Sequence, residues 1–129
     1  MQSRLGTIIG WTCAILVAAL NAFAAYSKFL PVVPGSPAEE YGKTLGTAGL
    51  ERPLGVLEII IVVLFLVPRT STVGFVLMIG YMGGVLATML THGLSHADSL
   101  MIYVALLLLT ISAWFRNPEL VARLRGKTV

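Results

Sequence analysis

The chain has 129 residues, of which 57% are hydrophobic and 12% are charged, and its mean hydropathy is +0.88. A soluble domain cannot carry this share of apolar side chains, so the composition predicts a single integral membrane domain over residues 1–129. The net charge of +3 is scattered along the chain, with no aromatic stripe in a polar segment, which excludes a nucleic-acid-binding groove.

The sequence carries none of the common motifs for nucleotide, hydrolytic or redox chemistry. The single cysteine, Cys13, excludes an internal disulfide and a C-x-x-C redox pair, and its apolar neighbours predict a packed small hydrophobe. The sequence also lacks a phosphate-binding loop, a nucleophile elbow and a dinucleotide fingerprint. We therefore expect no cofactor and no self-contained active site.

Residues 5–30 are predicted to form the first membrane-spanning helix, because an apolar run of this length crosses about 30 Å of hydrocarbon. The same stretch resembles a secretory signal peptide, with Arg4 before the apolar run and an A-x-A-like sequence at Ala22-Phe23-Ala24. The apolar run is longer than a signal peptide usually has, which favours an uncleaved helix.

The connection over residues 31–52 is long enough to need structure of its own. Its Ser36-Pro37-Ala38-Glu39 sequence predicts a helix from residue 37 to about residue 43, with serine as the cap, proline first and glutamate completing a capping box. We expect this short helix to lie on the outer surface as a lid over the first two spans.

Residues 50–67, 70–92 and 98–115 are predicted to be three further spans, giving an all-α, four-helix membrane bundle. An even number of spans puts both termini on one side, together with most of the cations: Arg4, Arg69, Arg116, Arg123, Arg125 and Lys127. The positive-inside rule then predicts an inner (plasma) membrane protein with both termini in the cytoplasm. Asn117 as the cap and Pro118 as the first helical residue predict an amphipathic helix in the cytoplasmic tail. Its arginines are expected to contact anionic lipid headgroups.

Small residues recur every four positions in two of these spans. They are Ala14, Ala18 and Ala22 in the first and Gly80, Gly84 and Thr88 in the third. Such stripes let helix backbones approach closely, either inside one bundle or across a homodimer. The large residues of these spans are predicted to fill the core or face lipid: Trp11, Phe75, Met78, Tyr81, Met82 and Met89.

Glu58 is the most informative residue, because a charge inside an apolar span is costly and needs a partner. Lys28, Asn21 and His92 are the candidates. Asn21 lies seven residues before Lys28 and therefore on the same helical face. Counted from the cytoplasmic ends, Glu58 and Lys28 lie too far apart to pair, whereas counted from the outer ends both lie within about two turns of the boundary.

Two readings of these polar residues stay open. In one, tilt or local thinning brings Lys28 within reach of Glu58 and creates a polar pocket in the outer leaflet, with Asn21 and His92 lining it. In the other, Lys28 extends to the interface and Glu58 is protonated or bonded to a hydroxyl. The first reading makes a testable claim about depth, namely that Lys28 lies within reach of Glu58.

The segment THGLSHAD brings His92, His96 and Asp98 close together in sequence. Gly93 interrupts the helical spacing that would align the histidines, and no second cluster offers further ligands, so we expect no metal site. Asp98 followed by Ser99 is better explained as the N-cap of the last span.

With these residues in view, residues 15 to 116 resemble the DoxX-like family of small four-helix membrane proteins. The resemblance rests on FAAYSKF at the end of the first helix and on RPLGVLEIIIVVLFLVPRTSTVGFVLMIGYMGGVLATMLTH. The family's recurrent polar positions map onto Lys28, Gly55, Glu58 and His92. Ala24 and Ala25 stand where many members have glycine, so the tightest packing of the first helix is not expected here.

The resemblance implies two alternative functions. One is a non-catalytic membrane protein that binds a lipid-like or small amphipathic ligand, or a partner membrane protein, through the Lys28 and Glu58 pocket. The other is a membrane subunit of a quinone-linked complex similar to thiosulfate:quinone oxidoreductase, with quinone as ligand. The second needs an electron carrier that this chain does not supply, so the first is preferred.

Overall fold

The computed structural model describes residues 3–127, and within them every regular element is helical. The α-helices are α1 (Arg4–Ser27), α2 (Pro37–Leu45), α3 (Glu51–Leu66), α4 (Ser71–Thr91), α5 (Leu100–Arg116) and α6 (Pro118–Leu124), and a 3-10 turn, η1 (Pro68–Thr70), precedes α4. The predicted all-α class is confirmed. The first helix ends earlier than the predicted residue 30, because Lys28 is its C-cap and the next residues form turns.

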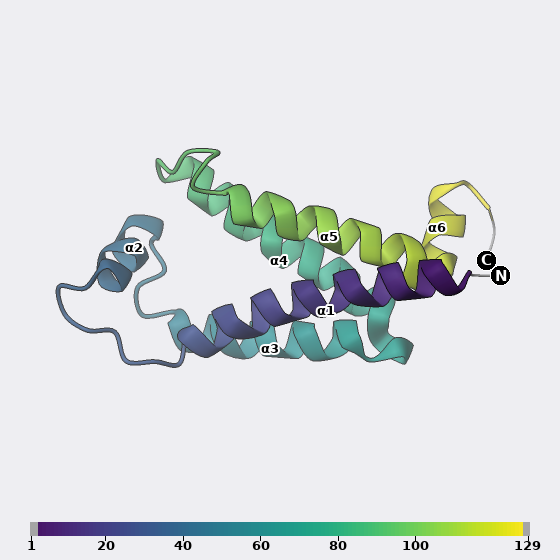
Figure 1. Cartoon of the computed structure of the whole chain (residues 1–129). Coiled ribbons are helices and arrows are strands. Elements are labelled where there is room, and N and C mark those ends of the chain that lie inside the picture. Colours follow the sequence, from purple (N-terminus) through teal and green to yellow (C-terminus); the bar gives the residue numbers. More distant parts are fainter. Residues whose placement is uncertain (1–2, 128–129) are drawn as a thin grey trace.

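The four long helices lie lengthwise beside one another (Figure 1). α1 packs against α5 and α3, and α4 packs against α3 and α5. Both termini lie at the end where α3 turns into α4, which we call the terminal end. α2 and the turn between α4 and α5 lie at the opposite end, which we call the α2 end (Figure 1).

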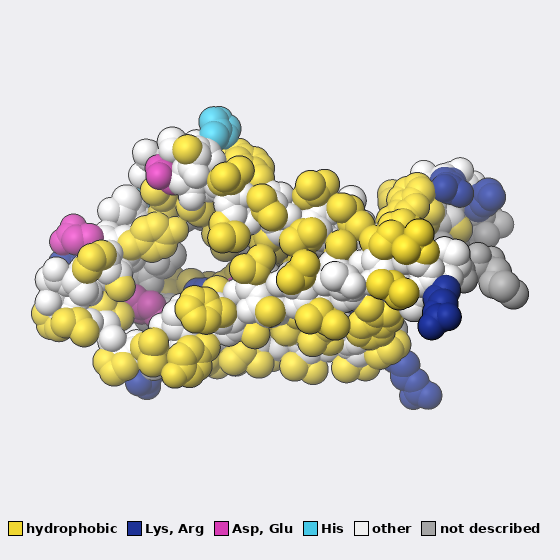
Figure 2. Space-filling view, in the orientation of Figure 1, with side chains coloured by type: hydrophobic (Ala, Val, Ile, Leu, Met, Phe, Trp, Pro, Cys, Tyr) yellow, Lys and Arg dark blue, Asp and Glu magenta, His cyan; other side chains and the backbone are white. Residues whose placement is uncertain are grey.

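Large hydrophobic side chains lie on the surface as well as in the interior, as expected for a chain with candidate membrane spans. Val17, Phe65 and Leu109 are fully buried in the core. Large hydrophobic side chains nevertheless cover the outside of the long helices (Figure 2). By length and composition, α1 and residues 68–91 can each cross a membrane, and the bent pair of α5 and α6, at 99°, would be a third span.

Glycines bring neighbouring helices close at three crossings. A Cβ added at Gly74 would lie 2.2 Å from the backbone nitrogen of Phe65, so α4 meets α3 with no room for a side chain. At Gly10 it would lie 2.9 Å from Phe115 Cβ on α5. At Gly55 it would lie 3.0 Å from the Phe29 ring and 3.2 Å from the Ala25 carbonyl oxygen, in line with the close packing predicted there.

Within one chain, the predicted close packing at Gly80 and Gly84 is wrong. A Cβ added at either residue would meet no atom within 4 Å among the residues described. On α1, Ala14 and Ala18 are buried, whereas Ala22 is exposed. A stripe of small residues permits a close approach but does not enforce one, and here the glycine stripe faces open space.

The helix ends agree with the sequence in part. Ser36 caps α2 as predicted, its Oγ accepting from the Glu39 backbone N–H at 3.3 Å, and α2 extends to Leu45. The Glu39 carboxylate instead accepts from Lys43, whose ammonium lowers the pKa of that carboxyl. Two other predicted caps are wrong: the Asp98 and Asn117 side chains make no cap hydrogen bond to the helix that follows.

Both side chains have other partners. The Asp98 carboxylate accepts from the Ser95 backbone N–H at 3.0 Å and from its hydroxyl at 2.9 Å, which closes the turn before α5. The buried Asn117 amide donates to Thr72 Oγ1 at 2.9 Å and to Ser71 Oγ at 3.2 Å. Asn117 therefore ties the end of α5 to the start of α4.

Candidate functional site

An ion pair joins α1 and α3 near the α2 end. Lys28 Nζ lies 2.7 Å from Glu58 Oε1, and the two side chains are 25% and 4% exposed. Lys28 is the C-cap of α1, and its Nζ also donates to the Ala24 carbonyl oxygen at 3.3 Å. The predicted proximity of Lys28 and Glu58 is confirmed, because the lysine side chain extends back along its own helix toward Glu58.

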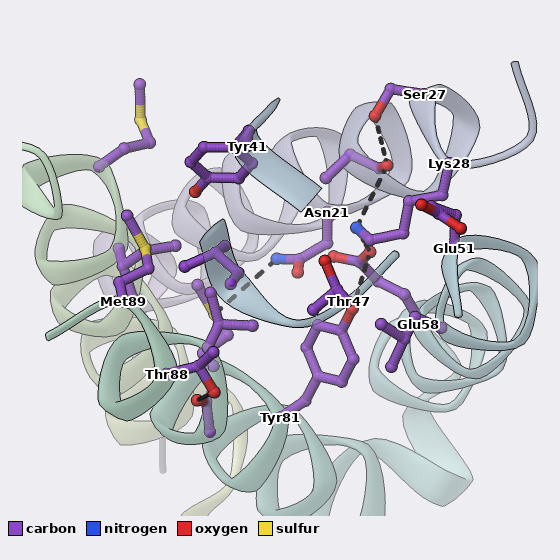
Figure 3. Close-up of a pocket in the computed structure, with 18 of the residues that line it drawn as sticks. Asn21, Ser27, Lys28, Tyr41, Thr47, Glu51, Glu58, Tyr81, Thr88 and Met89 are labelled. Carbon is purple, nitrogen blue, oxygen red and sulfur yellow. Dashed lines mark hydrogen bonds and ion pairs between the residues drawn. The ribbon is translucent and has the colours of Figure 1, made fainter. Parts of the chain in front are cut away.

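Tyr81 on α4 is a third member of this group. Its hydroxyl donates to Glu58 Oε1 at 3.3 Å, so an oxygen of Glu58 accepts from α1 and from α4 (Figure 3). Tyr81 packs against the core as predicted, but the hydrogen bond of its hydroxyl group to Glu58 was not predicted from the sequence. A tyrosine within an apolar helix needs a partner for its hydroxyl, and that need was the available signal.

Asn21 lies deeper on the same face of α1, as the sequence predicted. It is 5% exposed, and its Nδ2 donates to the Val17 carbonyl oxygen at 2.9 Å. The same nitrogen lies 4.0 Å from Met78 Sδ and 3.9 Å from Met82 Sδ on α4. These thioethers are weak acceptors, so the Asn21 amide is a polar group within an otherwise apolar region.

These side chains line a cavity of about 760 Å³ at the α2 end. The space-filling view shows the molecule hollowed there, between the α1 and α3 pair and the α4 and α5 pair (Figure 2). The walls come from every helix except α6 and are mostly apolar, and they include Leu20, Leu54, Val85, Met89, Ile102 and Ala105. Glycines at residues 80 and 84 belong to the same wall and enlarge it, because no side chain fills the space.

The α2 end of the cavity is polar. Tyr41 of α2 contributes to its lining, as do Thr47 and Glu51 (Figure 3). Gly42 and Asp98 also line it. The Ser95 backbone N–H and hydroxyl donate to the Asp98 carboxylate and lower its pKa. The lining thus combines a long apolar wall with one end that carries charges and hydroxyl groups.

His92 does not join this group. Its Nδ1 lies 2.8 Å from the Thr88 carbonyl oxygen at the end of its own helix, and it is exposed. Thr88 and Met89 line the cavity on α4, but His92 is not among the lining residues that the structure describes. The prediction that His92 helps to form the pocket is wrong, because α4 ends with this side chain turned back on its own backbone.

Within residues 3–127, no three His, Cys, Asp or Glu side chains gather as they would around a metal ion. His96 Nδ1 lies 2.7 Å from the Tyr103 hydroxyl, and Asp98 is engaged by Ser95. What the cavity offers is binding chemistry: hydrogen-bond donors and acceptors at one end and an apolar wall beyond them.

No protein-family model, curated protein or solved structure matches the chain.

Proposed function

We propose that the protein is a non-catalytic, DoxX-like membrane protein that binds a lipid-like or small amphipathic ligand in the cavity at the α2 end. The observation that carries the proposal is the cavity itself, about 760 Å³ with mostly apolar walls and a Lys28, Glu58 and Tyr81 group at one side. Sites for small molecules are commonly of this size and have this mixture of apolar wall and few polar groups.

The ligand would lie with its apolar part against α4 and α5 and its polar part near α2. Met89, Ile102 and Ala105 offer only apolar surface, whereas Lys28, Glu58 and Thr47 offer donors and acceptors. A wholly polar ligand would bury no apolar wall, and a wholly apolar ligand would displace water from the polar end without offering hydrogen bonds in its place. An amphipathic molecule satisfies both parts.

Charge restricts the polar part further. The cavity lining carries three carboxylates, Glu51, Glu58 and Asp98, and one ammonium, Lys28. Lys28 is already paired with Glu58. An anionic head group would therefore meet carboxylates that no cation offsets, so a neutral or cationic head group is favoured.

The proposal places the four long helices across the bilayer, with both termini in the cytoplasm and the α2 end outside. Of these helices, α3 has only 16 residues, so it would cross with its Glu51 end sunk below the outer boundary and covered by α2. The grouping of both termini at one end supports an even number of crossings (Figure 1), and the excess of arginine there supports the orientation.

Native mass spectrometry of the full-length protein, released from mild detergent, tests this function. We expect one amphipathic molecule bound per chain, which solvent extraction then identifies. A quinone in stoichiometric amount would instead favour the quinone-linked alternative. A chain that retains no small molecule, and gains none when exposed to total membrane lipids, would contradict the proposal.

A further inference from the structure

A second, smaller pocket lies at the terminal end, remote from the α2-end cavity. Its volume is about 150 Å³, and Thr7, Trp11, Pro68, Ser71 and Arg116 line it. These residues come from α1, η1, α4 and α5, so the pocket forms only where the four elements meet. The function proposed above makes no use of it.

The Arg116 guanidinium contacts two aromatic rings and two carbonyl oxygens in this pocket, but one of its nitrogens has no hydrogen-bond acceptor within the described part of the chain. Its Cζ lies 4.2 Å from the centroid of the Trp11 ring and 5.0 Å from that of Phe65. Its Nη2 donates to the Phe65 and Leu66 carbonyl oxygens at 3.1 and 3.3 Å, at the end of α3. Nη1 is buried and has no hydrogen-bond partner.

A guanidinium normally recruits a carboxylate in such a position. Within residues 3–127, the ion pairs at 4.0 Å or less are those of Lys28 with Glu58 and of Lys43 with Glu39, so no acidic side chain of the described chain reaches Arg116. A buried charged nitrogen without an acceptor is costly. Within residues 3–127 no side chain or carbonyl supplies an acceptor for Nη1, and an anion would provide both a hydrogen-bond acceptor and the opposite charge.

Ser71 supplies a second donor. It is 3% exposed, and its Oγ accepts from Asn117 Nδ2 at 3.2 Å, so its own hydroxyl hydrogen is left to donate. Ser71 is also the first residue of α4 and directly follows η1. A guanidinium and a buried hydroxyl donor thus meet at one small pocket.

We propose that this pocket binds a phosphate group. Arg116 and the Ser71 hydroxyl match the donors that phosphate oxygens take, and arginine is the side chain best suited to them. The phosphate belongs either to an anionic phospholipid whose acyl chains stay in the bilayer or to free phosphate. Exposed cations at the same end attract either source: Arg4, Arg69, Arg123 and Arg125.

Trp11 provides the readout. When a phosphate takes Nη1, the guanidinium turns on the Trp11 ring, which changes the fluorescence of that indole. The chain has two tryptophans, and Trp114→Phe leaves Trp11 as the sole reporter in full-length protein in a neutral detergent. Phosphatidylglycerol and inorganic phosphate are the probes, and diacylglycerol is the phosphate-free control.

A saturable fluorescence change with phosphatidylglycerol, and none with diacylglycerol, is expected. Saturation by inorganic phosphate alone would assign the site to free phosphate, which supports the same chemistry. Ser71→Ala removes one donor, while Asn117 keeps its hydrogen bond to Thr72 at 2.9 Å. Because the variant loses the hydrogen bond from the Ser71 hydroxyl to a charged phosphate, its affinity for the probe should fall about tenfold. Arg116→Lys replaces the planar guanidinium, which can donate two parallel hydrogen bonds, and should lower the affinity for the probe at least as much.

The matched control is the double variant Arg123→Gln and Arg125→Gln, which removes two exposed cations outside the pocket. It should leave the saturable change in place. If circular dichroism shows that Arg116→Lys does not fold, the affinity of Ser71→Ala for the probe tests the proposal. The proposal is overturned if neither probe gives a saturable change, or if Ser71→Ala binds the probe as tightly as the parent.

Discussion

Lys28 and Glu58 stabilise each other where neither charge would be stable alone. The Glu58 carboxylate is 4% exposed and accepts from both the Lys28 ammonium and the Tyr81 hydroxyl. Removing one partner of a buried ion pair leaves the other charge without compensation, whereas removing both can be nearly neutral. The pair thus holds α1 and α3 in register at the mouth of the cavity.

A double-mutant cycle measures this coupling. Lys28→Met and Glu58→Leu should each lower the free energy of unfolding by about 2 to 4 kcal/mol, and the double variant should lose less than the sum. The measurement is reversible unfolding in detergent, with Lys43→Met as the control because the Lys43 side chain is 60% exposed. If the effects of the two single changes simply add, Lys28 and Glu58 do not stabilise each other.

At the scale of the helices, Gly74 governs how closely α4 can approach α3. A Cβ there would lie 2.2 Å from the Phe65 backbone nitrogen, and backbone cannot move aside as a side chain can. Gly74→Ala should therefore cost about 3 kcal/mol by forcing the two helices apart. Gly83→Ala is the control on the same helix, because a Cβ there meets nothing within 4 Å. Thermal unfolding that shows equal effects for both variants would contradict this packing.

The turn between α4 and α5 depends on the charge of Asp98. The Ser95 N–H and hydroxyl lower the pKa of Asp98 in the folded protein. The folded carboxyl therefore binds a proton more weakly than an unperturbed aspartate, whose pKa is about 3.9. Its contribution to the turn is present above that value and is lost as the pH falls through the lowered folded pKa. An NMR titration of the Ser95 amide should give a midpoint below about 3.9. Asp98→Asn should abolish the titration, and a midpoint at or above the usual value would show that the hydrogen bonds do not form.

The helices could be predicted because they follow from local sequence patterns. The ion pair could be predicted because a charge within an apolar span is costly and needs a partner. The apolar runs and the Ser36-Pro37 cap predict helices directly, and the expense of Glu58 in an apolar span demands a partner. Gly80 and Gly84 could not be interpreted the same way, since a stripe of glycines looks identical whether it faces a helix or a cavity. Gly74 was missed because a single glycine has no pattern, and only the crossing with Phe65 gives it meaning.

At the scale of the whole molecule, the long helices pack tightly at the terminal end and leave space at the α2 end. Gly6 and Gly10 bring α1 onto the Phe115 side chain of α5 at the terminal end. At the other end the helices leave the cavity of about 760 Å³. This is the volume that the proposed amphipathic ligand would fill.

The most direct test is to fill the cavity from within. Gly84→Leu places a side chain in the open space that the cavity provides, and Gly83→Leu makes the same change one residue away, outside the cavity lining. At both positions an added Cβ meets no atom within 4 Å, and circular dichroism checks that each leucine variant folds. Native mass spectrometry should show the bound amphipathic molecule reduced about tenfold in Gly84→Leu, through steric exclusion, and unchanged in Gly83→Leu. Wild-type occupancy in Gly84→Leu would contradict the assignment of the cavity as the binding site.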